Sequence, residues 1–277
     1  MDRLTDALNG LRKNLSQAVA QGGSDLERFE CATCRDEEWI IVQTPHEVEL
    51  STGETKVLYD SHAELCPSCA QRKKVARLFR SSRITDGFQR LTFDGFRVEG
   101  RPRCVRDAMN AALDYVERFA AIHSTPRNSI ALLGPPGSGK THLLTAVSNA
   151  LLGQGVAVHY FPWVEGSNEL RGDLDAIQPK LDAMRTADGL YIDDVFKGRK
   201  VPTDFQLEWL FDVVNFRYMD NRPILVSSER DVDALCVVDE GIGSRLYERA
   251  KDYTVIMKLA ADEKSRLNYR LGMDDRS

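Results

Sequence analysis

The residues whose types and spacing could do chemistry lie first in a glycine-rich segment near the middle of the chain. It reads Gly134-Pro135-Pro136-Gly137-Ser138-Gly139-Lys140-Thr141 and fits G-x-x-x-x-G-K-[ST], the phosphate-binding P-loop. In such a loop backbone N–H groups surround the phosphates, Lys140 reaches the β- and γ-phosphates, and the Thr141 hydroxyl holds Mg²⁺. The segment predicts binding of ATP with Mg²⁺; an ordinary glycine turn after a strand is the alternative.

Two carboxylates, Asp193 and Asp194, form a second candidate site about fifty residues after Lys140. They end an apolar run, which is typical of a buried strand. Asp193 would hold Mg²⁺, directly or through water, and Asp194 would polarise the water that attacks the γ-phosphate. A cap on a turn is the alternative interpretation of this pair.

An arginine, Arg245, is a candidate arginine finger, which would stabilise charge on the phosphate of a neighbouring subunit. The alternative is an ordinary arginine on a helix surface. A further apolar run, residues 223–229, ends in Ser227-Ser228-Glu229, and a polar side chain there would lie beside the γ-phosphate.

Four cysteines in the first third of the chain form two C-x₂-C pairs, Cys31/Cys34 and Cys66/Cys69. Four thiolates are a complete tetrahedral set for a structural Zn²⁺. The insert between the pairs holds two candidate strands, as in a zinc ribbon. His46 or His62 could replace a cysteine, and redox-active cysteine pairs or thiols without a ligand would also fit this spacing. A domain this small, with few large apolar side chains, is expected to need a metal to fold.

The elements that must position the P-loop flank it directly. Residues 129–133 are an apolar run typical of a buried parallel strand, and residues 141–147 have the composition of a helix. A helix N-terminus directs N–H groups and the positive end of its dipole toward an anion. Further strands and helices alternate to the end of the chain, which predicts an α/β fold with a doubly wound parallel sheet.

Composition bounds the remaining possibilities. The chain has 277 residues, 42% of them hydrophobic, and a formal net charge of −5. This length suggests one large or two modest domains, and the negative charge argues against a protein that binds polyanions over its whole surface. No run of 18 apolar residues occurs, so we expect no membrane-spanning helix. The polar N-terminus lacks the apolar centre of a signal peptide, and we expect a cytoplasmic protein.

Two segments of the N-terminal third could contact partners. Apolar residues spaced three or four apart predict an amphipathic helix that packs on its own domain or on a partner: Leu4, Leu8, Leu11, Leu15 and Val19. Residues 71–83 are basic without an acidic residue and could contact nucleic acid phosphates. A solvated face or a contact with an acidic protein partner would explain the same composition.

The order of these motifs resembles the AAA+ helicase loaders of the bacterial DnaC/DnaI type, including phage-encoded relatives. The resemblance covers roughly residues 28–270. It rests on the two cysteine pairs, the P-loop, and four further segments: Leu91-Thr92-Phe93-Asp94-Gly95-Phe96, Ile192-Asp193-Asp194, Val214-Asn215-Phe216-Arg217-Tyr218 and Gly243-Ser244-Arg245-Leu246.

The resemblance implies an AAA+ ATPase domain at 85–277 after a zinc-binding, helicase-interacting domain at 1–84. By analogy the chain delivers a hexameric replicative DNA helicase onto single-stranded DNA, self-associates through its AAA+ module and hydrolyses ATP slowly. Arg245 takes the place of the arginine finger. Sensor 1 falls on Ser228 or on Glu229, where the family often has Asn, and sensor 2 on Arg266 or Arg270.

Two further function classes stay open. A transposition helper ATPase has a similar AAA+ module but usually lacks an N-terminal cysteine-rich domain. An ATP-binding switch or adaptor with little turnover is favoured by Glu229, because a carboxylate near the γ-phosphate is electrostatically unfavourable.

Overall fold

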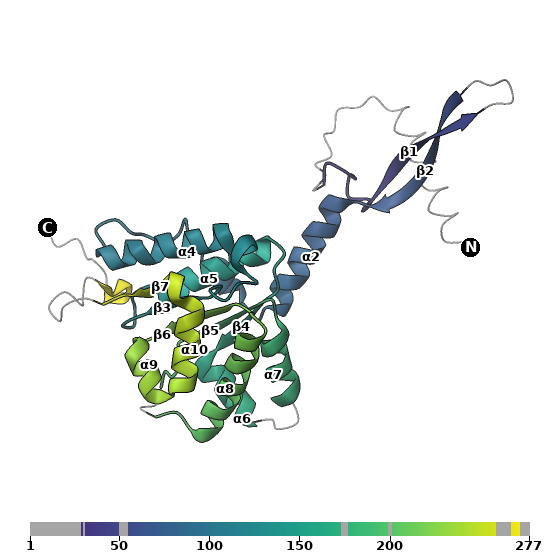
Figure 1. Ribbon diagram of the computed structural model, residues 1–277. Coiled ribbons are helices and arrows are strands. Elements are labelled where there is room, and N and C mark those ends of the chain that lie inside the picture. The colour runs from purple at the N-terminus through teal and green to yellow at the C-terminus, as the bar shows by residue number, and fades with distance from the viewer. Residues whose placement is uncertain are drawn as a thin grey trace. The chain divides into compact units, whose positions relative to one another are not determined.

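The computed structural model describes residues 29, 31–49, 55–172, 177–198, 201–258 and 267–271. The chain forms two compact units, Met1–Ala70 and Gln71–Ser277, drawn in Figure 1. This division lies inside a helix, α2 (Pro67–Ser81), whereas the sequence suggests a domain boundary after residue 84. The position of the boundary between independently folding domains stays a prediction. The amphipathic helix expected near the N-terminus lies outside the described residues.

The first unit is built on an antiparallel hairpin of β1 (Trp39–Glu49) and β2 (Thr55–Leu65). The register runs from Trp39 opposite Leu65 to Glu49 opposite Thr55, so both strands are longer than the sequence suggests. The four cysteines lie at the end of the hairpin where β1 begins and β2 ends. Among the described residues of this unit, they form the buried cluster, with Ile40 packed against them.

The second unit contains a five-stranded parallel sheet in the order β4-β5-β6-β3-β7. Its strands are β3 (Ile130–Leu133), β4 (Val158–Pro162), β5 (Gly189–Asp193), β6 (Ile224–Ser228) and β7 (Thr254–Ile256). The predicted α/β fold with a parallel sheet is therefore confirmed. Because all strands point the same way, their carboxyl ends gather the P-loop, Asp193 and Ser228 at one edge.

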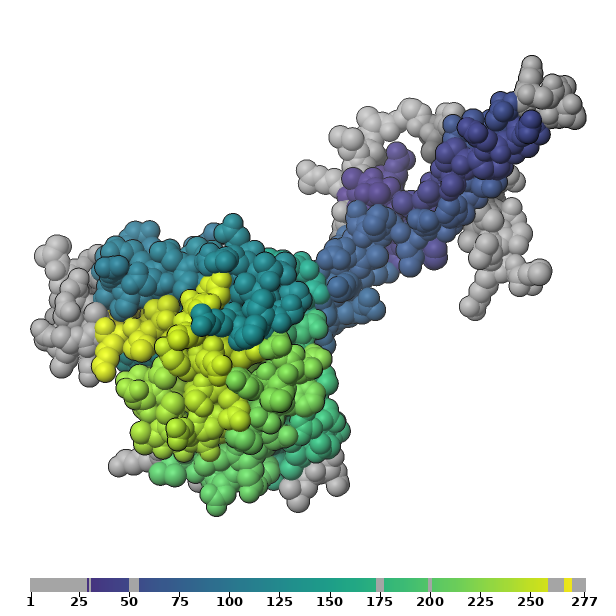
Figure 2. All heavy atoms as spheres, in the orientation of Figure 1, coloured from purple at the N-terminus to yellow at the C-terminus, as the bar shows by residue number. Residues whose placement is uncertain are grey.

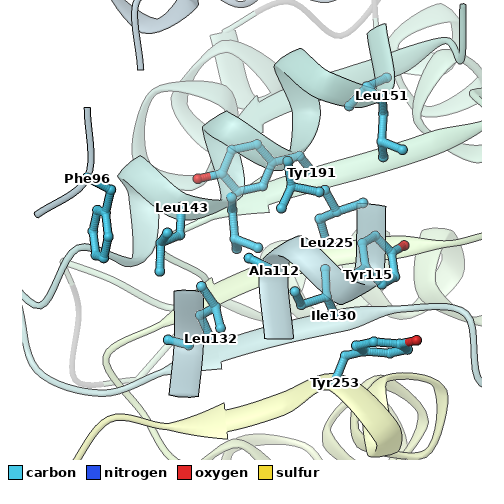
Figure 3. Close-up of a cluster of buried hydrophobic side chains, with 14 of the residues drawn as sticks. Phe96, Ala112, Tyr115, Ile130, Leu132, Leu143, Leu151, Tyr191, Leu225 and Tyr253 are labelled. Carbon is cyan, nitrogen blue, oxygen red and sulfur yellow. The ribbon is translucent and has the colours of Figure 1, made fainter. Parts of the chain in front are cut away.

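Successive side chains of each strand point to opposite faces of the sheet. Apolar side chains of the strands lie on both faces, so helices cover both. One face carries Ile130, Leu132, Tyr191 and Leu225, which pack under α4 (Arg103–Ile122) and α5 (Lys140–Gly153). Figure 3 shows this cluster, with Tyr115 of α4 close to Tyr253.

The opposite face carries Ala131, Leu133, Ile192 and Val226, packed under a second layer of helices. These are α6 (Trp163–Gly172), α7 (Ile177–Thr186), α8 (Asp204–Met219), α9 (Val232–Val238) and α10 (Glu240–Ala250). In the space-filling view α8 and α10, in green and yellow-green, form a continuous surface (Figure 2). The result is a three-layer α/β/α unit.

A fully buried arginine in α8, Arg217, ties this second layer together. Its guanidinium donates to the carbonyl oxygens of Met184 at 2.8 Å, Ala187 at 2.9 Å and Pro223 at 2.6 Å. The last carbonyls of a helix have no partner within the helix, so the arginine satisfies groups at the end of α7. Burial lowers the pKa of Arg217 to about 9, which leaves the guanidinium charged at neutral pH.

The short apolar stripe of the basic helix α2 packs within the second unit. Leu78 and Phe79 pack against the cluster under α4 and α5. The basic side chains point into solvent, as a solvated or phosphate-binding face requires: Arg72, Lys73, Lys74, Arg77 and Arg80 are all exposed. Within the described part of the chain, no helix is long and apolar enough to cross a membrane.

Candidate nucleotide-binding site and cysteine cluster

The P-loop joins β3 to α5 through three glycines in conformations that other residues adopt only under strain. Gly134, Gly137 and Gly139 have φ values of +147°, +77° and +92°. A Cβ atom at Gly134 would collide with the backbone of Met257, and one at Gly139 would lie 2.6 Å from the Phe96 ring. Glycine is required at these positions because both the dihedrals and the close contacts exclude a side chain.

The lysine of the loop folds back over it. Lys140 is 4% exposed, and its ammonium donates to the carbonyl oxygens of Gly134 at 2.8 Å and Pro135 at 2.9 Å. Burial lowers the pKa of Lys140, against the opposing effect of Asp194, Glu229 and Asp193. The ammonium therefore lies inside the loop, where a phosphate would also be held.

The Thr141 hydroxyl meets the first strand-terminal carboxylate. Thr141 Oγ1 donates to Asp193 Oδ1 at 3.1 Å, although 52 residues separate the two. Two adjacent ligands of an octahedral Mg²⁺ at about 2.1 Å would be about 3 Å apart. A hydroxyl and a carboxylate are the oxygen donors that Mg²⁺ prefers, so this pair fits the ion.

Two residues to which the sequence patterns assign no contact with Asp193 hold its carboxylate. Its Oδ1 atom accepts from Ser227 Oγ at 2.6 Å and from the Tyr191 hydroxyl at 2.8 Å. Burial raises the pKa of Asp193, while these hydrogen bonds oppose the rise. Tyr191 lies two residues before Asp193 and thus on the same strand face, a signal that the sequence does contain.

The second carboxylate, Asp194, lies outside the strand and pairs with a lysine. Its backbone is left-handed, with φ +56°, and its N–H donates to Ser227 Oγ at 2.7 Å. The ammonium of Lys197 lies 2.5 Å from Asp194 Oδ2 and 3.2 Å from Glu229 Oε1. The carboxylate of Glu229, which the sequence marks as unfavourable near a phosphate, is thereby neutralised.

The two sensor positions differ in what the structure places there. The Ser228 hydroxyl is buried and donates to the Val195 carbonyl at 2.9 Å, so it is already engaged within the fold. Arg270 lines a cavity of about 180 Å³ together with Lys140, Thr141 and Asp194. Arg266 lies outside the described residues. The roles of Ser228 and Arg270 as sensors stay predictions.

A short C-terminal segment, 267–271, lies against the P-loop. The backbone N–H of Tyr269 donates to the Gly137 carbonyl at 2.8 Å, and a Cβ at Gly137 would collide with the Asn268 side chain. The Tyr269 ring packs on Phe96, with centroids 5.3 Å apart. These rings and His142 line a recess of about 540 Å³ beside Gly139, and aromatic walls of this kind suit a nucleobase.

Arg245 is not among the residues that line these cavities. It lies on α10, and its guanidinium faces the rings of Phe211 at 5.2 Å and Tyr218 at 5.5 Å. It also donates to the Gly241 carbonyl at 2.8 Å. This location is compatible with action on another subunit, which stays a prediction.

The four cysteine sulfurs converge in the first unit. Cys31, Cys34, Cys66 and Cys69 are each at most 6% exposed, and their Sγ atoms all lie within 4.8 Å of one another. The Cys31 and Cys66 sulfurs are 3.8 Å apart, the edge of a tetrahedron about a Zn²⁺ with Zn–S bonds of about 2.3 Å.

Hydrogen bonds also reach these sulfurs. The N–H of Glu38 donates to Cys34 Sγ at 3.3 Å. Hydrogen bonds from the backbone and side chain of Cys34 lower the pKa of the Cys31 thiol to about 6, whereas the hydrogen bond with Cys34 and burial raise the pKa of Cys69. The two histidines considered as substitutes lie along the hairpin, where His46 pairs with Asp60 and His62 with Glu64. The donor set that fits zinc is therefore the four cysteines.

Comparisons with known proteins agree with this geometry. Residues 88–249 match the family model described as the bacterial DnaA ATPase domain. The phage-like element PBSX protein XkdC of Bacillus subtilis is 42% identical over 276 residues, which cover 98% of this chain and 97% of XkdC. The chain thus has a relative of matching length encoded in a phage-like element.

Two solved structures share the fold. The structure of DnaI has a TM-score of 0.52 at 20% identity and covers 64% of this chain and 95% of its own. The DnaC helicase loader has a TM-score of 0.53 at 18% identity and covers 63% of this chain and 100% of its own. The chain belongs to the family of the bacterial DnaA ATPase domain, and its second unit shares the fold of DnaI and of the DnaC helicase loader.

Proposed function

We propose that this protein is an ATP-dependent loader that binds a hexameric replicative helicase and delivers it onto single-stranded DNA. The observation that carries the proposal is the presence, in one chain, of a P-loop site on a DnaC/DnaI-type sheet and a separate unit built around four cysteines. The full-length similarity to XkdC supports a phage-associated version of such a loader.

Each site residue has a role in this proposal. The P-loop, residues 134–141, holds the phosphates of ATP, with Lys140 on the β- and γ-phosphates. Thr141 and Asp193 hold Mg²⁺, which would neutralise phosphate charge during transfer to water. Asp194 polarises the attacking water, and Arg245 reaches the nucleotide of a neighbouring subunit after self-association.

The hairpin offers a contact surface for the helicase. In the register of β1 and β2, alternate residues share one face, and that face carries exposed large apolar side chains: Trp39, Ile41, Val57, Tyr59 and Leu65. Exposed aromatic groups of this kind are typical of protein interfaces. The four cysteines hold a structural Zn²⁺ that supplies the folding energy of this unit.

The basic face of α2 would contact the DNA backbone. Its five exposed lysines and arginines would neutralise phosphates irrespective of base sequence, so binding should weaken as salt rises. A slow ATP switch is the second candidate function, and one observation favours it. The Asp194 Oδ2 atom is 2.5 Å from the Lys197 ammonium, so one of the two oxygens that could polarise water is engaged in this arrangement.

The test is capture of partners by the full-length chain from a bacterial lysate, with bound proteins identified by mass. We expect a hexameric replicative helicase with the wild-type chain, and none with Cys66→Ser, which lacks one ligand of the cluster. Recovery of a transposase instead would favour the transposition helper. For the switch, ATP turnover should stay unchanged when single-stranded DNA and the captured helicase are added.

A further inference from the structure

One cation beside the P-loop has no role among those proposed for the nucleotide site. Lys197 follows Asp194 by three residues and lies in the segment after β5. It lines the same cavity as Lys140, Thr141 and Arg270. Its ammonium is held by two carboxylates, at 2.5 Å from Asp194 and 3.2 Å from Glu229.

We propose that Lys197 is a second lysine for the γ-phosphate and that Glu229 positions it. The Glu229–Lys197 ion pair thereby takes the place of a neutral polar side chain beside the terminal phosphate. This inference rests on the proposed binding of ATP at the P-loop, and it adds a residue that distinguishes a triphosphate from a diphosphate.

The geometry of donors supports this assignment. An ammonium has three N–H donors and no acceptor. Two carboxylates pair with the Lys197 ammonium, which leaves one N–H for an oxygen of a phosphate in the cavity that Lys197 lines. The side chain is 34% exposed, so it borders the cavity and is not locked inside the protein.

Both carboxylates that pair with the ammonium directly follow strands of the sheet, β5 and β6. Asp194 is held by its N–H bond to Ser227 Oγ at 2.7 Å, and Glu229 follows β6 directly. Phosphate contacts from a charged donor are stronger than those from a neutral one. Here the charged donor also removes the repulsion that Glu229 alone would exert on a γ-phosphate.

The neighbouring polar side chain is not available for this role. The Ser228 hydroxyl donates to the Val195 carbonyl and accepts from the N–H of Arg230 at 3.2 Å. It is fully buried. Lys197, which pairs with Glu229 at the end of β6, is therefore the group that lines the cavity.

The experiment compares binding of ADP with binding of AMPPCP, a non-hydrolysable triphosphate, by calorimetry in Mg²⁺. Lys197→Met should weaken AMPPCP binding about tenfold or more, the effect of one lost charge-assisted hydrogen bond, and change ADP binding by less than about twofold. Lys258→Met is the matched control, because that lysine is 76% exposed and pairs only loosely with Asp231, at 3.6 Å.

A second comparison tests the pairing with Glu229. Glu229→Gln should weaken AMPPCP binding in the wild-type chain, where the carboxylate positions Lys197, but strengthen it in the Lys197→Met chain, where the carboxylate is uncompensated. Purely additive effects would contradict the positioning role. Thermal unfolding establishes that each variant folds, and Lys197→Gln replaces Lys197→Met if the latter does not.

The outcomes separate this inference from the proposed function. If Lys197→Met kept the wild-type ratio of AMPPCP to ADP affinity, the assignment of Lys197 would be wrong while ATP binding stood. If the wild-type and Lys258→Met chains bound neither nucleotide, the proposed function would be wrong and this inference with it.

Discussion

The two units of this protein achieve order by opposite means. The second unit buries two extensive apolar clusters, one on each face of its sheet. In the described part of the first unit, the buried cluster is four cysteines with Ile40 beside them. Its hairpin strands expose most of their side chains.

The difference lies in what each unit requires from a ligand. A unit with a large apolar core folds without its ligand, and the ligand then adds binding energy. A unit whose buried cluster is four cysteine sulfurs within 4.8 Å of one another depends on a metal ion that binds these sulfurs in place of their protons. Metal should thus determine the fold of the first unit, whereas nucleotide should only modulate the second.

The largest expected effect breaks the first unit alone. Cys66→Ser should release the metal and unfold the hairpin, since a structural zinc site contributes on the order of 10 kcal/mol or more. The AAA+ unit should unfold at its usual temperature and bind ATP as before. Metal content by mass spectrometry and the amide NMR spectrum measure both effects.

Cys104→Ser is the control for that variant, because Cys104 lies outside the cluster and packs on the core of the second unit. It should retain the metal. Stoichiometric zinc in Cys66→Ser would contradict the four-cysteine site.

The next prediction changes nucleotide binding by the second unit and leaves its fold unchanged. Lys140→Ala should weaken ATP binding by about a hundredfold or more, since a charged donor to phosphate is worth up to about 3 kcal/mol. The hairpin and its metal should be unaffected. Calorimetric titration with ATP measures this, with Lys258→Ala as the surface control; unchanged affinity would rule out the P-loop assignment.

A smaller effect tests the packing that supports the site. Arg217→Met should leave the carbonyls at the end of α7 without donors and destabilise the second unit by about 3 kcal/mol. For a unit of this size the unfolding temperature should fall by about 6–12 °C. Arg118→Met is the control, because Arg118 is 62% exposed. An equal fall of the unfolding temperature in both variants would show that the buried hydrogen bonds of Arg217 do not stabilise the unit.

The smallest effect strains the loop itself. Gly137→Ala places a side chain at φ +77°, at a cost of about 1–2 kcal/mol, and against Asn268. The unfolding temperature should drop by a few degrees. Adding Asn268→Ala to the Gly137→Ala chain should recover part of this loss by removing the contact. Gly153→Ala, where a Cβ meets nothing within 4 Å, should be neutral or stabilising.

The sequence predicts what depends on local pattern and misses what depends on register. The P-loop, the strand before it and the cysteine pairs follow from spacing along the chain. Ser227 meets Asp193 because β5 and β6 pair in one particular register, with Ile192 opposite Val226. Nothing local fixes that register, so the contact could not be predicted.

The same holds for residues that act from a distance. Arg217 is part of a segment that the resemblance rests on, but only the fold shows that it caps α7. Asn268 reaches Gly137 from a segment much later in the chain. Lys197 is closer, and its spacing of three from Asp194 is a signal that could be used in other sequences.

The order of strands in the sheet has a consequence for synthesis of the protein on the ribosome. Both neighbours of β3 come later in the chain: Ile130 pairs beside Leu225, and Ala131 beside Thr254. The strand that carries the P-loop is therefore unpaired until about a hundred more residues have been made. At about 5–20 residues per second, it waits roughly 5–20 s, a period in which its apolar side chains depend on chaperones or on α4 for cover.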